Sequence, residues 1–295
     1  MLLVGRIQKA TGGFYYVGTG GGIVECRARG LFRKQGISPC VGDEVEIETS
    51  PDDGSGYVVD IHPRKNVLMR PPLANLDYMI SVISITDPSP NFLIVDTYLA
   101  LLEYQDIPAL IVVTKSDLYN AASLVALYEK SGYRVHVVSA ITGEGIPALL
   151  DDIAGKFCAV SGNSGVGKSS LLNAINPEFR IDVGDTSKKL GRGRHTTRHV
   201  EIFTLSNGAM VADTPGFSAL DIVRLSDLRA DELDACFLDF LPYLYKCRFD
   251  DCRHIHEVGC AVHRAVDMGE ISESRYRSYQ KLYDEIKDIK EWNRK

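Results

Sequence analysis

One stretch of this sequence, residues 157–175, reads FCAVSGNSGVGKSSLLNAI. Its middle, from Gly162 to Ser169, matches the pattern G-x-x-x-x-G-K-[ST] in full. An apolar strand precedes the match and a helical segment follows it, which is the context that a phosphate-binding loop requires. Glycines let the backbone turn so that successive N–H groups face phosphate oxygens. The stretch therefore predicts a P-loop that follows a buried strand.

Two side chains of this loop have specific expected tasks. Lys168 places a point charge on the β- and γ-phosphates, and the Ser169 hydroxyl joins the coordination shell of Mg²⁺. Further along, the apolar run AMVA ends at Asp213, which opens the tetrapeptide DTPG. An aspartate at a strand end near a P-loop can hold Mg²⁺, commonly through water, and the Gly216 N–H is placed to sense a γ-phosphate. The expected nucleotide-binding residues of the loop are Gly162, Asn163, Ser164, Gly165, Val166, Gly167, Lys168, Ser169 and Ser170.

Two short motifs upstream of the P-loop each close an apolar run. The first, TKSD, runs from Thr114 to Asp117, and the second is Ser139-Ala140. The Asp117 carboxylate can accept both N–H groups on the Watson–Crick edge of guanine in a charge-assisted pair. The stem of Lys115 can lie along the base, and the Ser139-Ala140 turn can offer a backbone N–H to guanine O6. The motifs favour GTP and GDP over ATP, against the alternative of a P-loop ATPase.

The order of these motifs along the chain is permuted. Ras-like proteins run from P-loop to DxxG, NKxD and SA, whereas here TKSD and SA come first. Apolar runs alternate with helical stretches near residues 92–104 and 121–131, which predicts a mostly parallel α/β sheet. A permutation is tolerated where the original termini lie close together. We therefore expect a circularly permuted α/β P-loop GTPase domain over residues 67–221. Thr114 stands where asparagine is commoner in Ras-like proteins, so the sequence does not show whether the local loop hydrogen bond of that asparagine is made here.

The regions on either side of this domain have other patterns. Residues 1–66 contain the alternating runs GFYYVGTG, GIVECRARG, DEVEIETS and GYVVDIHP, separated by turn residues. They predict a small antiparallel β-barrel of the OB type, with a β-domain that binds no ligand as the alternative. The proline-rich stretch 63–72 is typical of a linker or junction. Residues 222–295 predict helical pieces around a cysteine cluster, and the expected last helix, 275–295, holds more basic than acidic residues and predicts a modest positive face.

The cysteine cluster predicts a metal site. The chain has 7 cysteines, and three of them lie close together at Cys247, Cys252 and Cys260. A disulfide framework is not expected in a cytosolic chain of this size, so the cluster favours metal ligands. Three thiolates and one imidazole form a closed tetrahedral Zn²⁺ site, whose role is structural. His254, His256 and His263 compete for the fourth place. Free reduced cysteines are the alternative.

The segment 188–198, KKLGRGRHTTR, is strongly basic in an acidic protein. Thr196 or Thr197 is expected to supply a hydroxyl to Mg²⁺ when the γ-phosphate is present. Phe217 stands where Ras-like enzymes carry a water-orienting glutamine, so intrinsic hydrolysis should be slow unless another group substitutes. His195 is the candidate, and a role in folding the loop or contacting RNA is the alternative. The basic charge can contact RNA phosphates, or it can simply be solvated.

Composition excludes several classes of protein. With 295 residues, 45% hydrophobic and 24% charged, the chain predicts two or three globular domains rather than a disordered polymer. The formal net charge of −6 excludes a bulk polycation, so any RNA contact needs local basic patches. No apolar run is long enough for a membrane span and no secretory signal is recognisable. We therefore expect a cytoplasmic protein without membrane contact.

Taken with the permuted order, the flanking regions make the chain resemble the bacterial ribosome small-subunit-dependent GTPase A family over essentially its whole length. The blocks that carry the resemblance are RKNVLMRPPLANLD, VTKSDL, GNSGVGKSSLLNA, GRGRHTTRH, DTPGF and CRFDDCRHIHEVGCAV. The resemblance selects His254 as the fourth zinc ligand, and the family has a histidine in the block that contains His195.

The resemblance implies a GTP hydrolase that binds the small (30S) ribosomal subunit and its 16S rRNA and acts late in subunit maturation. Turnover would be stimulated by the subunit, with GTP or GDP, Mg²⁺ and one structural Zn²⁺ per chain as cofactors. A monomer is expected, because no heptad pattern or large patch suggests otherwise. The alternative function is a GTP-gated RNA-binding module with negligible intrinsic hydrolysis, which Phe217 keeps open.

Overall fold

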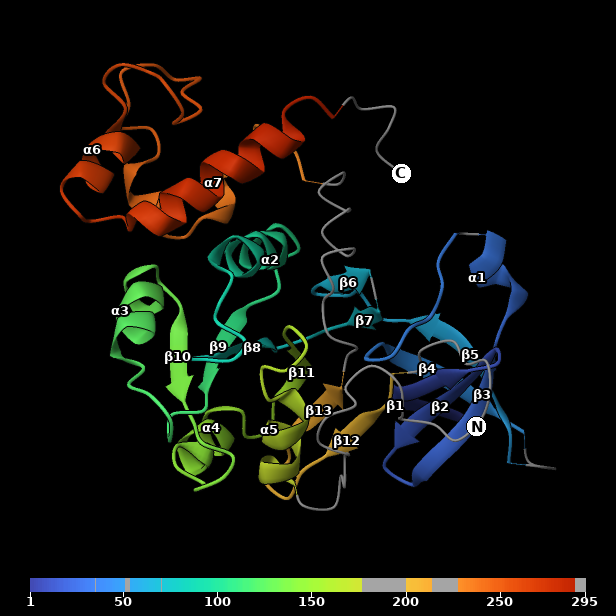
Figure 1. Cartoon of the computed structure of the whole chain (residues 1–295). Helices are drawn as coiled ribbons and strands as arrows, with labels where there is room; N and C mark the ends of the chain where they lie inside the picture. The colour runs from blue at the N-terminus through green and yellow to red at the C-terminus, as the bar shows by residue number, and fades with distance from the viewer. Residues whose placement is uncertain (35, 51–53, 70, 177–199, 214–227, 290–295) are drawn as a thin grey trace.

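The computed structural model describes residues 1–34, 36–50, 54–69, 71–176, 200–213 and 228–289 (Figure 1). It has an N-terminal barrel, a central sheet covered by helices and a C-terminal helical part that packs against α2 (Figure 1). No helix among these residues is long and apolar enough to cross a membrane.

Five strands form the closed barrel in the order β1-β2-β3-β5-β4. β1 closes the barrel by pairing antiparallel with β4, and β3 pairs parallel with β5. This is the OB-type barrel that the sequence predicts. The elements are β1 (Leu2–Thr11), β2 (Phe14–Thr19), β3 (Gly22–Ala28), α1 (Gly30–Lys34), β4 (Glu44–Thr49) and β5 (Gly56–Ile61).

Strand β1 was absent from the sequence prediction, which found the other four strands. Its side chains do not alternate cleanly between buried and exposed, and Ile7 is its one fully buried residue. A register shift between Ile7 and Lys9 breaks the period of two that reveals a strand. The pairing of β1 with both β2 and β4 therefore depends on long-range contacts that its own pattern does not announce.

The central sheet has the order β10-β9-β8-β11-β13-β12, in which only the edge strand β12 runs antiparallel. Helices α2 and α3 cover one face, where Leu99 and Tyr128 pack with Ile111, and α4 and α5 cover the other, where Leu149 and Leu172 are buried. The alternating α/β pattern predicted from the sequence is confirmed. The strands are β8 (Tyr78–Ser84), β9 (Ala109–Thr114), β10 (Arg134–Val137), β11 (Phe157–Ser161), β12 (Ile202–Thr204) and β13 (Met210–Asp213). The helices are α2 (Phe92–Tyr104), α3 (Ala122–Lys130), α4 (Ile146–Asp152) and α5 (Lys168–Ile175).

The proline-rich stretch after the barrel forms a structured junction. It contributes β6 (Val67–Met69) and β7 (Pro72–Ala74), which pair antiparallel. The fully buried Asp43 carboxylate accepts two hydrogen bonds from Arg64, at 2.6 and 2.7 Å. Asn66 and Asn75 connect the junction further, since the Asn75 amide donates to the carbonyl of Gly42 at 3.1 Å. The stretch therefore behaves as a junction and not as a loose linker.

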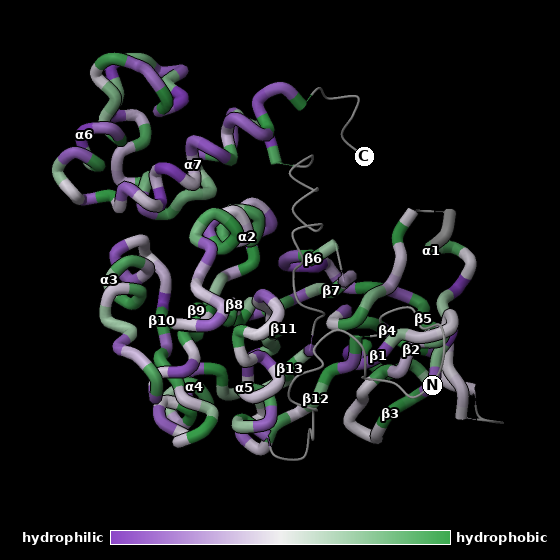
Figure 2. Tube along the Cα trace, viewed as in Figure 1, coloured by the Kyte–Doolittle hydropathy of each residue, from purple (hydrophilic) through white to green (hydrophobic). Residues whose placement is uncertain are grey.

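The C-terminal part contains η3 (Asp234–Cys236), η4 (Leu241–Tyr243), α6 (Ala261–Asp267) and α7 (Glu273–Ile286). Figure 2 shows α2 as mostly hydrophobic and α7 as mostly hydrophilic. Arg275 does not contribute to the positive face expected on the last helix, because it is 1% exposed and its guanidinium is paired with Asp96 and Asp239. An arginine that is buried and paired with two carboxylates adds no positive charge to the surface.

Gly42 is the tightest point of the junction and gives a stability prediction. Its φ is +92°, and a Cβ there would lie 2.1 Å from the Ala74 carbonyl oxygen. We expect Gly42→Ala to lower the free energy of unfolding by about 2–5 kcal/mol, because backbone strain and a clash add. Urea denaturation measures the loss.

Gly13→Ala is the matched control. Gly13 has a φ of +83°, with nothing within 4 Å of the added Cβ. This variant carries the backbone strain alone and should lose only about 1 kcal/mol. Equal losses in the two variants would show that the contact with Ala74 is unimportant.

Candidate nucleotide site and metal centre

The P-loop connects the carboxyl end of β11 to the first turn of α5, as the sequence predicts. Gly162 must be glycine here, because its φ is +155° and a Cβ would lie 2.4 Å from the Val82 carbonyl oxygen. Gly167, with a φ of +94°, is the N-cap of α5. The loop thus passes close over β8 and turns directly into the helix, so that the helix N-terminus faces the loop.

Lys168 is folded into the loop that precedes it. Its ammonium donates to the carbonyls of Gly162 at 2.6 Å and Asn163 at 2.7 Å. Burial lowers the pKa of Lys168 to about 8, an effect that the nearby Asp213 opposes. Burial likewise raises the pKa of Asp213 to about 6, against the attraction of Lys168. The loop and the end of β13 therefore hold two opposite charges in a desolvated space, where an added anion or divalent cation has strong electrostatic interactions.

Thr114 joins the TKSD loop to the P-loop. Its hydroxyl lies 2.6 Å from the Val166 carbonyl oxygen, to which it donates, and 3.3 Å from the Ile83 carbonyl oxygen. The neighbouring Lys115 ammonium donates to the Gly165 carbonyl at 3.1 Å and to the backbone oxygen of Asp87. The local hydrogen bond that the threonine left open in the sequence is therefore made by its hydroxyl.

Asp117 and Ser139 meet although they follow different strands. The Ser139 hydroxyl, on a fully buried residue, donates to Asp117 Oδ1 at 2.7 Å. The Ser139 Oγ in turn accepts backbone N–H groups from Ile141 at 3.2 Å and Thr142 at 3.1 Å. Asp117 itself is exposed. This network fixes the orientation of a carboxylate that points to solvent beside the SA turn.

The parallel sheet places TKSD, SA, the P-loop and Asp213 at the carboxyl ends of β9, β10, β11 and β13, on one edge. The remaining predicted residues, His195, Thr196, Thr197 and Gly216, lie outside the described residues, as does Phe217.

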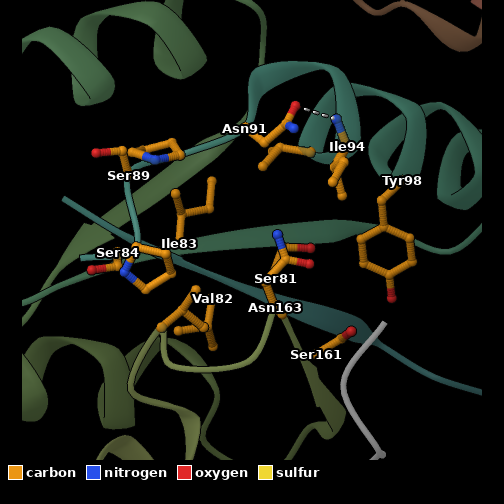
Figure 3. A pocket seen from close by; sticks show the side chains of 15 residues that line it. Ser81, Val82, Ile83, Ser84, Ser89, Asn91, Ile94, Tyr98, Ser161 and Asn163 are labelled. Carbon is orange, nitrogen blue, oxygen red and sulfur yellow. Dashed lines mark hydrogen bonds between the residues drawn. The ribbon is translucent and has the colours of Figure 1, made fainter. Parts of the chain in front are cut away.

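A cavity of about 40 Å³ lies beside the P-loop (Figure 3). The carboxyl end of β8, the first turns of α2 and the start of the P-loop form its walls. Asn91 caps α2 at this point by accepting the Ile94 N–H at 3.3 Å (Figure 3). Tyr98 and Ser161 lie on another wall of the cavity. Sequence reasoning missed this cavity, because nothing in the pattern of α2 marks the residues that face the loop.

The four residues Cys247, Cys252, His254 and Cys260 converge in the C-terminal part, with their ligand atoms all within 4.8 Å of one another. His254 Nδ1 lies 3.5, 3.5 and 3.3 Å from the three sulfurs, and the sulfurs of Cys247 and Cys260 are 3.9 Å apart. Tetrahedral zinc, with Zn–S near 2.3 Å and Zn–N near 2.0 Å, requires edges of about 3.5 Å (N–S) and about 3.8 Å (S–S). The donor set and its spacing fit one Zn²⁺ with no open position.

The rival histidines have other partners or positions. His263 Nε2 lies 3.0 Å from the carbonyl oxygen of His254 and 2.7 Å from the Tyr276 hydroxyl. His256 is exposed. The structure therefore places His254, and neither of the other two, among the thiolates.

Asp234 supports the zinc site and was missed in the sequence. Its Oδ2 lies 3.3 Å from His254 Nε2, on the side of the ring away from the sulfurs. A carboxylate in this place fixes the tautomer and orientation of a metal-binding imidazole. No spacing rule marks this aspartate, because it lies 20 residues before His254 and reaches it only through the fold.

The fold and this site define a circularly permuted P-loop GTPase, in which the guanine motifs precede the phosphate loop along the chain but share one sheet edge with it. The family model of the RsgA GTPase matches residues 61–223, and that of the RsgA N-terminal domain matches residues 4–58. The chain belongs to the RsgA GTPase family. It is therefore a GTPase that uses GTP and Mg²⁺, and its Cys₃His cluster suits one zinc ion.

Curated relatives match along the whole chain. The small ribosomal subunit biogenesis GTPase RsgA of Caldanaerobacter subterraneus subsp. tengcongensis is 44% identical over 287 residues, which covers 96% of each chain. The protein of the same name from Shouchella clausii is 43% identical over 292 residues, covering 97% of this chain and 98% of the relative.

Two solved structures have the same architecture. YjeQ from Thermotoga maritima superposes with a TM-score of 0.81 at 35% identity, covering 97% of this chain and 99% of that one. YloQ, described as a circularly permuted GTPase, gives a TM-score of 0.81 at 36% identity, with coverage of 98% and 96%.

The carboxylate behind the zinc ligand gives a metal-binding prediction. We expect Asp234→Asn to weaken zinc binding about 10–100-fold, because an amide orients the imidazole less strongly than a carboxylate. Competition against a chromophoric chelator measures the affinity. Asp231→Asn is the control, because the Asp231 side chain is bound by Arg229 rather than by a zinc ligand. If the two variants held zinc equally well, Asp234 would have no role in the site.

Proposed function

We propose that this protein is a GTP hydrolase that binds the small ribosomal subunit and acts late in its maturation, with turnover stimulated by the subunit. The observation that carries the proposal is that three features lie at one edge of the sheet. They are the Asp117 carboxylate, which Ser139 orients; the P-loop, to which Thr114 is hydrogen-bonded; and Asp213. The curated relatives that match nearly end to end are named small ribosomal subunit biogenesis GTPases, which supports the choice of partner.

The nucleotide lies, in this proposal, across the carboxyl edge of the sheet. The Asp117 carboxylate accepts the two guanine N–H groups while Ser139 holds it in place. The stem of Lys115 lies along the base, and the Ala140 N–H reaches guanine O6. The P-loop residues 162–170 surround the phosphates.

Metal and phosphate charge are handled at the other end of the nucleotide. Lys168 leaves the loop carbonyls for the β- and γ-phosphates, a stronger partner for an ammonium. Ser169 would supply a hydroxyl to Mg²⁺, and Asp213 would help to hold the ion. The ion would supply positive charge against the charge on the phosphates.

The roles proposed for residues 195–197, 216 and 217 rest on the sequence alone, because these residues lie outside the described part of the chain. Thr196 or Thr197 adds a hydroxyl to Mg²⁺ in the GTP state, and the Gly216 N–H senses the γ-phosphate. Because Phe217 cannot orient water, His195 or a group from the ribosomal partner completes the catalytic site. Slow turnover of the free protein follows from this arrangement.

The two flanking domains, 1–66 and 222–295, hold the 30S subunit through its 16S rRNA on either side of the GTPase domain, 67–221. OB-type barrels and basic side chains suit RNA. Around the zinc site, Arg248 has its guanidinium over the Phe249 ring at 5.5 Å, and both side chains can contact nucleotides. We further propose that the protein acts as a cytoplasmic monomer.

A second function is favoured by Phe217 alone. In it, GTP gates RNA binding and hydrolysis is incidental, so the nucleotide state sets affinity for the subunit without fast turnover. This alternative uses the same nucleotide and zinc sites. The two differ in whether the subunit accelerates hydrolysis.

Base recognition is tested by Asp117→Asn. Losing the charged acceptor should weaken GTP binding by about 1.5–3 kcal/mol, roughly 10–150-fold. Titration with a fluorescent GTP analogue measures the loss, and Asp151→Asn, on the exposed side of α4, is the control. Full GTP affinity in Asp117→Asn would disprove the assignment of this carboxylate to guanine.

The choice between the two functions rests on turnover. We expect small subunits to accelerate GTP hydrolysis by at least about 10-fold, because a partner group supplies the water-orienting function that Phe217 lacks. Phosphate release is measured with and without small subunits, with large subunits and ATP as controls. Binding without acceleration would favour the GTP-gated module instead.

A further inference from the structure

Helix α2 contacts both the nucleotide site and the C-terminal part that holds the Cys₃His cluster, which we call the zinc domain. Asn91, Ile94 and Tyr98 line the cavity beside the P-loop (Figure 3). Ala100 and Tyr104, further along the same helix, pack into the hydrophobic cluster of the zinc domain. Figure 1 shows α2 between the central sheet and α7. A rigid helix that contacts both regions transmits a displacement of one to the other.

The contact with the zinc domain centres on a buried ion cluster. Arg275 of α7 is 1% exposed, and its Nη1 donates to Asp96 Oδ1 on α2 at 2.9 Å. Its Nε and Nη2 donate to the two carboxylate oxygens of Asp239 at 3.3 and 2.8 Å. The guanidinium also lies 4.7 Å from the centroid of the Phe237 ring. Two carboxylates and an aromatic face therefore hold one side chain in a single orientation.

The same helix that carries Arg275 is bonded to the zinc site. The Tyr276 hydroxyl donates to the carbonyl oxygen of the zinc ligand His254 at 2.9 Å. The Tyr279 hydroxyl donates to the carbonyl oxygen of Arg253 at 2.8 Å. A displacement of the backbone at Arg253 and His254 would therefore also displace α7 next to Arg275.

At its other end the chain of contacts reaches the cavity beside the P-loop. Asp96 lies two residues from Tyr98, which lines this cavity together with Ser161, the residue before Gly162. The loop before α2 is bonded too, because Lys115 donates to the carbonyl of Thr86 at 3.4 Å and to that of Gly165 at 3.1 Å. Hydrogen bonds and helix α2 thus connect His254 to the wall of the cavity beside the phosphate loop.

A buried ion pair gives little net stability over apolar residues of the same volume, but it fixes geometry. An apolar contact would have held α7 on α2 as well and would have tolerated sliding. The ion cluster adds a fixed register between the two helices.

We propose that Arg275 is a positioning residue for the GTPase site: through Asp96 it fixes α2 and couples the state of the zinc domain to the affinity of the P-loop for nucleotide. The inference rests on the proposed nucleotide site. A ribosomal ligand that moves the zinc domain would change nucleotide affinity by this route, and by reciprocity nucleotide would change the affinity for that ligand.

The test compares GTP-analogue affinity before and after zinc removal in three proteins. A zinc-selective chelator is used with Mg²⁺ in excess, and binding is followed with a fluorescent non-hydrolysable GTP analogue. In the wild-type protein we expect zinc removal to weaken binding about 5-fold or more. Arg277→Met, on the exposed side of the same helix, should behave alike. In Arg275→Met the effect of zinc removal should fall below about 2-fold, although zinc content and thermal midpoint confirm a folded holoprotein.

The other possible results would overturn either the coupling or the nucleotide site. An undiminished zinc effect in Arg275→Met, or no effect in the wild type, would overturn the coupling. If Arg275→Met does not fold, Asp96→Asn decides by the same comparison, because it keeps an acceptor for Arg275 and removes the charge. If both variants lose zinc, the cluster is only structural and the proposal fails. A wild-type protein that binds no GTP analogue would refute the nucleotide site itself.

Discussion

The parallel pairing of β8, β9, β11 and β13 is the constraint on which the rest of this structure depends. Parallel strands bring their carboxyl ends to one edge, whatever the order in which the chain visits them. Nucleotide recognition needs this common edge and does not need a particular chain order. The permutation therefore leaves the guanine motifs and the P-loop adjacent, while it changes where the chain enters and leaves the domain. The exit after β13 now leads toward the zinc domain, and the entry before β8 comes from the barrel.

Local signals account for what the sequence predicted well. The P-loop, TKSD, SA and the cysteine cluster each lie within a few residues, and the glycines, apolar runs and thiolates that define them act at short range. The parallel strands were visible because both their faces are buried, which leaves continuous apolar runs. Long-range features were invisible for the converse reason. Strand β1 is specified by two partners across the barrel, and Asp234 reaches His254 only through the folded chain. Arg275 looked like surface charge in the sequence, because nothing nearby shows that Asp96, 179 residues away, would bury it.

A buried arginine–aspartate cluster attaches the zinc domain to the core, and a second arginine–aspartate pair fixes the stretch by which the chain leaves the barrel. At the barrel, Arg64 binds the fully buried Asp43 and also the carbonyl oxygen of Ser38 at 2.8 Å. At the zinc domain, Arg275 joins Asp96 to Asp239. Arginine suits this task because its planar fork donates in fixed directions to two oxygens. The Arg275 cluster specifies an orientation between the zinc domain and α2, which hydrophobic packing alone specifies less sharply.

This arrangement bears on how a GTPase can respond to a large partner. A partner that touches the barrel and the zinc domain holds the GTPase domain from two sides, through junctions that resist rotation. Strain between the two contacts then falls on the elements that connect them, among them α2, which lines the P-loop cavity and packs against the zinc domain. A zinc ion held there would stiffen its domain, because four ligands in about 14 residues, backed by Asp234, would order residues 247–260. A stiff domain on an oriented junction passes force to α2, whereas a soft domain would absorb it.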